Sequence, residues 1–270
     1  MQNNSELAID LDRIVRSKVK NRKVPQFILN WGKRFIHQDF INAFLTRGYD
    51  GVEFCTNCLK YLDVTIDVEG LENLEVMKDH LCTFAPNHPL GGVDGIALIG
   101  LIGGHCDGNI RLLVNDFLMN IKSIASVSVG VNKLGGQSRN LPAMMKEMYS
   151  SSSHLLIFPA GKCSRKIDGK IQDVPWNKSF VKMSVESARW IIPVHFVGQN
   201  SKRFYRVDSI AKKLGIKFNI AMMFLPDELY RAQHSRYKVI FGKPLPPSFF
   251  DSSRTPYEWA QHVRGIVYDM

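Results

Sequence analysis

The stretch Cys82–Ile102, CTFAPNHPLGGVDGIALIGLI, decides the fold of this chain. It opens with a short apolar run, Cys82–Ala85, and closes with a helical candidate, Asp94–Ile102. The residues between them include a proline and two adjacent glycines, which favour a sharp turn. The stretch therefore predicts a buried strand, a tight turn and a helix, which is one unit of an α/β layer.

The same alternation recurs along the rest of the chain. Strands are expected at Val64–Val68, Cys82–Ala85, Ile110–Val114, Ser126–Val129, Leu155–Phe158, Ile191–Val197, Ile220–Phe224 and Lys238–Phe241. Helices are expected at Asp94–Ile102, Leu141–Met148, Asn177–Trp190 and Pro256–Tyr268. This order predicts an α/β fold with a mixed, largely parallel sheet flanked by helices.

An N-terminal segment, residues 1–60, is predicted to precede the α/β domain of residues 61–270. From Phe27 to Leu45, apolar residues recur at steps of three and four, which is typical of amphipathic helices. A break is expected near Gln38, with Asp39 as the N-cap of the second helix. Two interpretations stay open here. The helices pack on the main domain, or they lie in the plane of a membrane surface.

The overall composition is that of a globular protein. The chain has 270 residues, of which 45% are hydrophobic and 22% charged, and this excludes a disordered, collagenous or disulfide-stabilised mini-protein. The five cysteines are an odd number without a framework spacing, and no secretory signal is evident. A reducing, cytoplasmic compartment is therefore expected.

The net charge of +10 points to a polyanionic partner. Eight basic residues and no acidic one lie between Arg13 and Arg34, whereas no recognisable nucleic-acid-binding motif accompanies them. An anionic membrane surface is therefore expected as a partner, and nucleic acid is not. The longest apolar run, Ile96–Gly103, has eight residues, against the roughly 20 that a membrane span needs. The chain is expected to attach peripherally to the inner face of the cell membrane.

The first turn with unusual chemistry is Asn87–Asp94. A histidine at the end of a strand, with a carboxylate close by, is suited to general base catalysis, because the carboxylate orients the ring and stabilises its charged form. On a continuous helix His88 and Asp94 would lie about 240° apart. Pro89 and the glycine pair that follows supply a bend that would bring them together. The alternative is that Asp94 only caps its helix.

The second such turn is Phe158–Lys166, FPAGKCSRK. It combines a proline, a glycine, hydroxyl and thiol side chains and three cations. The pattern predicts an anion-binding loop in which Lys162 and Arg165 supply charge. The alternative is a solvated basic loop.

An ordered series of motifs resembles the glycerolipid acyltransferase superfamily. The series is Asn87-His88-Pro89 with Asp94, then Phe158–Arg165, then Ile192-Pro193-Val194. Within that superfamily, Asn87–Gly95 and Phe158–Arg165, continued by Asp173, Trp176 and Lys178, are similar to the hemolysin-related branch of bacterial lyso-ornithine and lyso-glycine lipid O-acyltransferases.

Three positions depart from the superfamily pattern. Five residues separate His88 from Asp94, where four are usual; Ala160 replaces a glutamate; and Cys163 stands where threonine or arginine is expected. The last two fall in the region that handles the acceptor, so they weaken the case for a phosphate-bearing acceptor more than the case for acyl transfer.

The resemblance implies an O-acyltransferase that moves a fatty acyl group from an acyl carrier protein or coenzyme A thioester to a hydroxyl of a lyso-lipid. It implies His88 as the general base and Asp94 as the residue that orients it. The same resemblance implies a substrate-binding set of Arg139, Phe158, Pro159, Gly161, Lys162, Ser164 and Arg165. The thioester is a co-substrate, so no cofactor is expected.

Two other functions stay open from the sequence. One is 1-acylglycerol-3-phosphate acyltransferase, and the other, from a different class, is a non-catalytic membrane-binding or lytic, hemolysin-like protein. No metal is predicted, because Cys55 and Cys58 form a lone CxxC without a second pair at zinc spacing. Cys163 lacks the partners of a nucleophile, and direct attack by a hydroxyl on a thioester needs no covalent enzyme intermediate.

Overall fold

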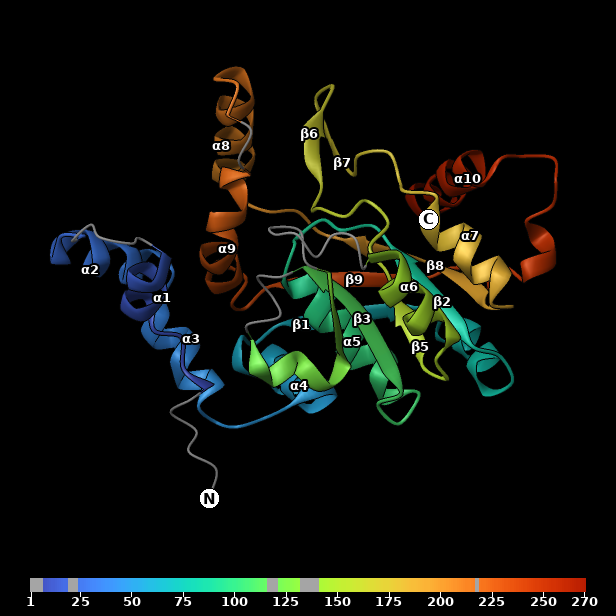
Figure 1. The fold of residues 1–270 in the computed structure, drawn as a ribbon, viewed down its shortest axis with the longest axis horizontal. Coiled ribbons are helices and arrows are strands. Elements are labelled where there is room, and N and C mark those ends of the chain that lie inside the picture. The colour runs from blue at the N-terminus through green and yellow to red at the C-terminus, as the bar shows by residue number, and fades with distance from the viewer. Residues whose placement is uncertain (1–6, 19–23, 116–120, 132–140, 217–218) are drawn as a thin grey trace.

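The centre of the fold is a seven-stranded sheet in the order β1-β9-β8-β2-β5-β3-β4 (Figure 1). The computed structural model describes residues 7–18, 24–115, 121–131, 141–216 and 219–270. The strands of this sheet are β1 (Thr65–Glu69), β2 (Cys82–Pro86), β3 (Ile110–Asn115), β4 (Ser128–Val131), β5 (His154–Leu156), β8 (Trp190–Val197) and β9 (Arg236–Phe241). All neighbours pair in parallel except β8 and β9, so the predicted mixed, largely parallel sheet is confirmed.

Helices cover both faces of the sheet. On one face lie α4 (Gly51–Tyr61) and α5 (Val93–Gly104), and on the other lie α6 (Leu141–Ser150), α7 (Ser179–Glu186) and α10 (Pro256–Asp269). Strand β2 is buried on both sides, which explains its continuous apolar sequence. Its Phe84 joins the core under α4 and α5, whereas Thr83 accepts a hydrogen bond from Ser184 of α7 at 2.9 Å.

The N-terminal segment consists of α1 (Leu11–Lys18), α2 (Gln26–Phe35) and α3 (Gln38–Leu45). The predicted break near Gln38 is confirmed, but Asp39 is not the N-cap. His37 is the N-cap with a left-handed φ of 51°, which leaves Asp39 inside the first turn of α3. The His37 ring also stacks on Tyr230 with centroids 3.7 Å apart, so the segment packs on α9 (Leu225–Arg231).

Three element predictions need correction. The expected strand Ile220–Phe224 is a 3₁₀ helix, η6. The expected helix Asn177–Trp190 is shorter, because α7 ends at Glu186 and Trp190 opens β8. The strand expected from Ser126 begins at Ser128, after the 3₁₀ helix η4 (Lys122–Val127). A short apolar run cannot by itself distinguish a strand from a helical turn.

Two further elements rise beside the carboxyl end of the parallel strands. They are α8 (Lys202–Lys213) and the antiparallel hairpin of β6 (Arg165–Ile167) and β7 (Lys170–Gln172), which stand next to each other in Figure 1. Among the described helices, none combines the length and the apolar character needed to cross a bilayer.

Candidate active site

The first turn leaves β2 and is fixed to the neighbouring strand β8 by Asn87. The Asn87 side-chain amide donates to the carbonyl of Phe196 at 3.0 Å, and the backbone N–H of Phe196 donates to Asn87 Oδ1 at 2.7 Å. Gly91 then takes a φ of +77°, and a Cβ on it would lie 3.1 Å from the Cβ of Cys163. Both the left-handed backbone and the crowding favour glycine at this bend.

The bend brings His88 and Asp94 together. His88 Nδ1 lies 2.9 Å from Asp94 Oδ2, and the buried carboxylate also accepts the backbone N–H groups of Leu90, Gly91 and Gly95 at 2.9, 3.1 and 2.9 Å. Burial raises the pKa of Asp94, yet the charge and hydrogen bond of His88 and the backbone donors outweigh it and hold the pKa below its ordinary value. Asp94 is therefore ionised at neutral pH.

An ionised Asp94 also fixes the protonation of the histidine ring. A carboxylate can only accept, so Nδ1 of His88 donates and Nε2 carries the lone pair of the neutral ring. The His88 side chain is 17% exposed, whereas that of Asp94 is fully buried. A partly open imidazole with a free lone pair and a buried carboxylate behind it can remove a proton from a hydroxyl.

The second turn is hydrogen-bonded directly to the first. The backbone N–H of Ser164 donates to the carbonyl of His88 at 2.7 Å, and the Phe158 ring packs on the His88 ring with centroids 3.9 Å apart. Gly161 adopts a φ of +65° and donates its N–H to the Phe158 carbonyl at 3.0 Å, which closes the turn. Of the predicted substrate-binding residues, Phe158 and Ser164 thus contact the histidine.

The carboxylate of Asp173 is hydrogen-bonded to both turns, although the sequence analysis assigned this residue no role. Its Oδ1 accepts the backbone N–H of His88 at 3.3 Å and the Ser164 hydroxyl at 2.6 Å, while its Oδ2 accepts the Trp176 indole N–H at 2.9 Å. Burial raises the pKa of Asp173 despite these donors. The only signal for it in the sequence was its place in the motif that continues the second turn.

Arg165 lies inward rather than toward solvent. Its Nε is 2.9 Å from Asp208 Oδ1 on α8, and its side chain is 2% exposed. Its Nη1 donates to the Cys163 carbonyl at 2.7 Å and its Nη2 to Asn219 Oδ1 at 3.0 Å. The guanidinium is therefore committed to the protein, and its predicted contact with a head group stays untested.

The other predicted cations differ in their placement. Lys162 is exposed in the second turn, whereas Arg139 lies outside the described residues. Cys163 is buried, and burial raises the pKa of its thiol, which opposes the formation of a nucleophilic thiolate.

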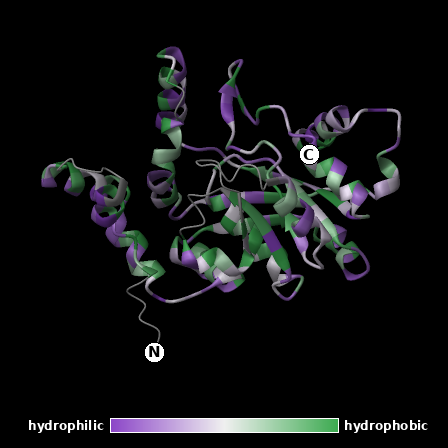
Figure 2. Cartoon of the chain, in the orientation of Figure 1, coloured by the Kyte–Doolittle hydropathy of each residue, from purple (hydrophilic) through white to green (hydrophobic). Residues whose placement is uncertain are grey.

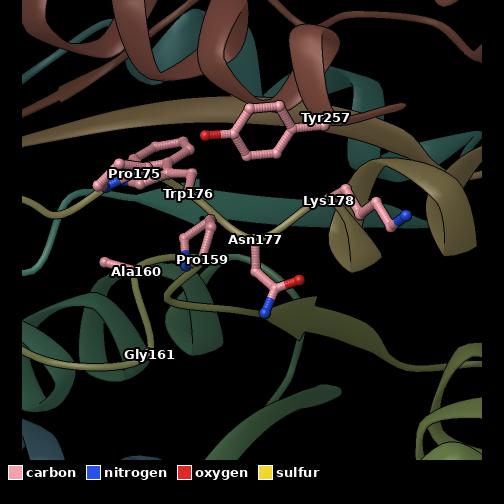
Figure 3. Close-up of a pocket in the computed structure, with 8 residues that line it drawn as sticks. All are labelled: Pro159, Ala160, Gly161, Pro175, Trp176, Asn177, Lys178 and Tyr257. Carbon is pink, nitrogen blue, oxygen red and sulfur yellow. The ribbon is translucent and has the colours of Figure 1, made fainter. Parts of the chain in front are cut away.

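Two hollows flank the joined turns. The first, of about 430 Å³, is drawn in Figure 3 and is lined by Pro159, Ala160, Gly161, Pro175, Trp176, Asn177, Lys178 and Tyr257. Its two walls are held together by the Asn177 N–H, which donates to the Pro159 carbonyl at 3.0 Å. The second, of about 420 Å³, has Leu90, Gly92 and Val93 of the first turn in its wall. Each hollow is therefore lined in part by one of the two turns, and His88 is not among the lining residues of either.

The strand–turn–helix unit, the His88–Asp94 pair and the second turn are compatible with an acyl-transfer enzyme. A family model described as "Acyltransferase" matches residues 13–269, so the chain belongs to this acyltransferase family and transfers acyl groups. Family membership also contradicts a non-catalytic protein, whereas no finding tests the hemolysin-like activity.

Two bacterial relatives match the whole chain. The lyso-glycine lipid O-acyltransferases of Bacteroides thetaiotaomicron and Phocaeicola vulgatus are each 43% identical to it over 274 residues, covering 100% of this chain and 100% and 98% of those proteins. The crystal structure of the 1-acyl-sn-glycerophosphate acyltransferase PlsC from Thermotoga maritima is similar with a TM-score of 0.52 and 17% identity, over 81% of this chain and 77% of that one. At this identity the likeness to PlsC shows the fold alone.

Proposed function

We propose that this enzyme moves a fatty acyl group from an acyl carrier protein or coenzyme A thioester onto the hydroxyl of a lyso-amino-acid lipid, with lyso-glycine lipid as the preferred acceptor. The observation that carries the chemistry is the His88–Asp94 pair at 2.9 Å beside the second turn. The acceptor is supported by the names of the two relatives that are 43% identical over the whole chain.

In the proposed reaction, Nε2 of His88 removes the proton of the acceptor hydroxyl. The hydroxyl oxygen attacks the thioester carbonyl carbon, and the tetrahedral intermediate collapses with loss of the thiolate. The His88 proton returns to that leaving sulfur, so an ester and a free thiol are formed. Asp94 keeps the ring in the required tautomer and stabilises its transient positive charge.

The head group is proposed to bind at the second turn. Its exposed cations are Lys162 and Lys166, of which Lys162 is the proposed partner, whereas Arg165 holds the turn in place through Asp208. A glycine joined to its acyl chain through the amine ends in a carboxylate, which one lysine can pair.

Peripheral attachment to an anionic membrane is the third part of the proposal. On α2, Phe27 is 72% exposed and Trp31 is 64% exposed, and Lys33 and Arg34 follow in its last turn. Exposed aromatic side chains next to cations are typical of helices that lie in a lipid interface. The second interpretation of the N-terminal segment is therefore compatible with the packing of α3 on α9.

The test supplies the purified protein with an acyl thioester and either lyso-glycine lipid or lysophosphatidic acid. His88→Ala should lower kcat by about 10² to 10⁴, because the general base is lost. His105→Ala, which removes an exposed histidine at the end of α5, is the matched control and should retain full activity. Full turnover by a folded His88→Ala protein would contradict the mechanism. Preference for lysophosphatidic acid would contradict the acceptor and favour 1-acylglycerol-3-phosphate acyltransferase instead.

A further inference from the structure

One face of helix α8 is buried against the rest of the fold, and the opposite face is exposed. Phe204, Tyr205, Asp208 and Ala211 are buried on the inner face. On the opposite side, Ile210 follows Arg206 by four residues, and Lys213 and Leu214 follow Ile210 by three and four. All four residues are exposed. We call these four residues the α8 outer face. Its two aliphatic side chains, Ile210 and Leu214, are 56% and 70% exposed.

The inner face holds α8 firmly against the catalytic turns. Asp208 pairs with Arg165 of the second turn at 2.9 Å and with Lys212 at 2.6 Å. The Arg165 guanidinium also lies 5.2 Å from the Phe204 ring centroid. A buried charge that is paired and hydrogen-bonded on several sides is costly to move. The α8 outer face therefore keeps a fixed position relative to His88.

Other apolar side chains on and after α8 are exposed as well. Ile216, just beyond the end of α8, is 41% exposed, and Met223 of η6 is 58% exposed. Phe224, the next residue, contacts Phe35 of α2 edge to face, with centroids 5.0 Å apart. Because Ala221 of η6 packs with Phe204 and Tyr205, η6 joins the inner face of α8 to the helix that carries Phe27 and Trp31.

We propose that the α8 outer face is a second lipid-contact surface, which lies on an anionic bilayer together with α2. This proposal rests on the proposed function in one respect only, namely that the enzyme must reach a lipid acceptor within its membrane. Arg206 and Lys213 supply charge complementary to anionic lipid head groups, while Ile210 and Leu214 supply apolar groups that enter the interface. Figure 2 shows this mixture along α8, where hydrophilic and hydrophobic residues interchange on a helix that projects from the fold.

The chemistry of this face favours lipid over an acidic protein as its partner. An acidic protein would be held by the cations, and the exposed aliphatic side chains would contribute less. A bilayer uses both kinds of group, because cations stay at the head groups while aliphatic chains and the stems of Lys and Arg reach below them. Because Asp208 of α8 pairs with Arg165 of the second turn, contact of α8 with lipid also fixes the distance between the second turn and the lipid surface.

The experiment measures sedimentation of the full chain with vesicles of phosphatidylcholine and phosphatidylglycerol. The variant Ile210→Ser/Leu214→Ser should weaken partitioning at least about tenfold. Arg206→Gln/Lys213→Gln should weaken it at low salt, by about fivefold for each cation, and should have little effect in high salt or with pure phosphatidylcholine. Leu71→Ser, which removes a leucine that is 41% exposed on the 3₁₀ helix η2 (Leu71–Lys78), is the matched control and should partition as the wild type does.

Two outcomes would overturn the proposal. Partitioning of the Ile210→Ser/Leu214→Ser variant equal to that of the wild type would remove lipid contact from this face. Loss of binding in the charge variant alone would show that the cations bind the head groups while Ile210 and Leu214 do not enter the interface, which contradicts the proposed lipid contact of the aliphatic side chains. The measurement needs no turnover, so its result is independent of whether the proposed acceptor is correct. As a second readout, the Ile210→Ser/Leu214→Ser variant should turn over acceptor in vesicles more slowly than the wild type, and acceptor in detergent micelles equally fast.

Discussion

At the scale of single residues, the site depends on two buried carboxylates with opposite pKa shifts. Asp94 has a lowered pKa and faces the imidazole ring, whereas Asp173 has a raised pKa and holds the backbone beneath it. One carboxylate therefore serves as a charge and the other as a hydrogen-bond acceptor that joins the two turns. The first role requires ionisation, while the second is also compatible with a protonated carboxyl group.

Asp173→Asn tests this second role. The amide keeps the size of the side chain but replaces one accepting oxygen with a donor, so one of the three donors from His88, Ser164 and Trp176 loses its partner. A lost buried acceptor costs about 1–3 kcal/mol. We expect kcat to fall about tenfold with little change in the KM for the acceptor, since about 1.4 kcal/mol corresponds to a factor of ten. Asp168→Asn, on the exposed turn of the β6–β7 hairpin, should leave both constants unchanged.

The pH dependence gives this substitution a signature that simple destabilisation lacks. Because burial raises the pKa of Asp173, its contribution to stability is present below the unfolded pKa, about 3.9, and is lost as the pH rises through the higher folded value. The amide that the Asp173→Asn change introduces does not titrate in this range. The difference in free energy of unfolding between wild type and variant should therefore shrink as the pH rises above about 4. A constant difference across that window would contradict the assignment.

The sequence predicted the proximity of His88 and Asp94 because the cause was local. Pro89, Gly91 and Gly92 lie between the two residues, and a sharp turn there follows from their backbone preferences alone. The surroundings of Arg165 could not be predicted in this way. Its partner Asp208 is 43 residues further along the chain, and only the packing of α8 brings the two together. The catalytic and binding roles of the site residues stay predictions.

At the scale of elements, the predictions located strands and helices of the layered fold, although the end of α7 and the start of β4 were wrong. The runs around β2, α5 and α10 were located because their lengths and apolar patterns match their environment. Ile220–Phe224 was wrong as a strand, since its burial comes from α8. Ala221 is buried in a small cluster with Phe204 and Tyr205, away from the sheet. The composition of a short segment shows that it is apolar, but it does not show which element of the fold buries that segment.

The end of α7 shows why the helix predicted to extend to Trp190 was too long. Ala188 has a φ of 53°, its N–H donates to Val185, and the next N–H, that of Arg189, donates to Ser184. These two bonds form a Schellman motif, which usually has glycine at the left-handed position. With alanine there, the sequence lacks the usual signal for a helix end.

Ala188→Gly should therefore stabilise the protein. Alanine in the left-handed region costs about 1–2 kcal/mol, and glycine removes this cost. Part of the stabilisation is offset by the greater conformational freedom of glycine in the unfolded chain. We expect the free energy of unfolding to rise by about 0.5–1 kcal/mol in urea denaturation. Ala43→Gly, at an exposed position inside α3, is the opposite control and should lower it by about 1 kcal/mol. A destabilised Ala188→Gly protein would show that the left-handed backbone is not strained.

At the scale of the whole molecule, the proposed contact with an anionic membrane accounts for both the net charge of +10 and the two exposed apolar surfaces. The chain carries 35 basic residues against 25 acidic ones, and cations flank the exposed side chains both on α2 and on α8. The sequence indicated the charge and the amphipathic N-terminal helix. It indicated the basic residues of α8 as a solvated face that could help to bind anionic lipid. It did not indicate that Ile210 and Leu214 lie on the same face as Arg206 and Lys213, because the inner face of α8 must be known first.

If α2 and the α8 outer face lie on one bilayer, their contributions to membrane binding should combine. Phe27→Ser/Trp31→Ser is expected to weaken partitioning into anionic vesicles at least about tenfold, because two exposed apolar side chains no longer enter the interface. Because both surfaces belong to one chain, the second contact with the membrane forms intramolecularly once the first has formed. The two pairs of substitutions are well separated, so the binding free energies that they cost should add. The variant with all four substitutions, at Phe27, Trp31, Ile210 and Leu214, should therefore partition about a hundredfold more weakly than the wild type. Vesicle sedimentation at fixed salt measures this, with circular dichroism to confirm the fold. A fourfold variant no weaker than either double variant would mean that the two surfaces do not meet the same membrane.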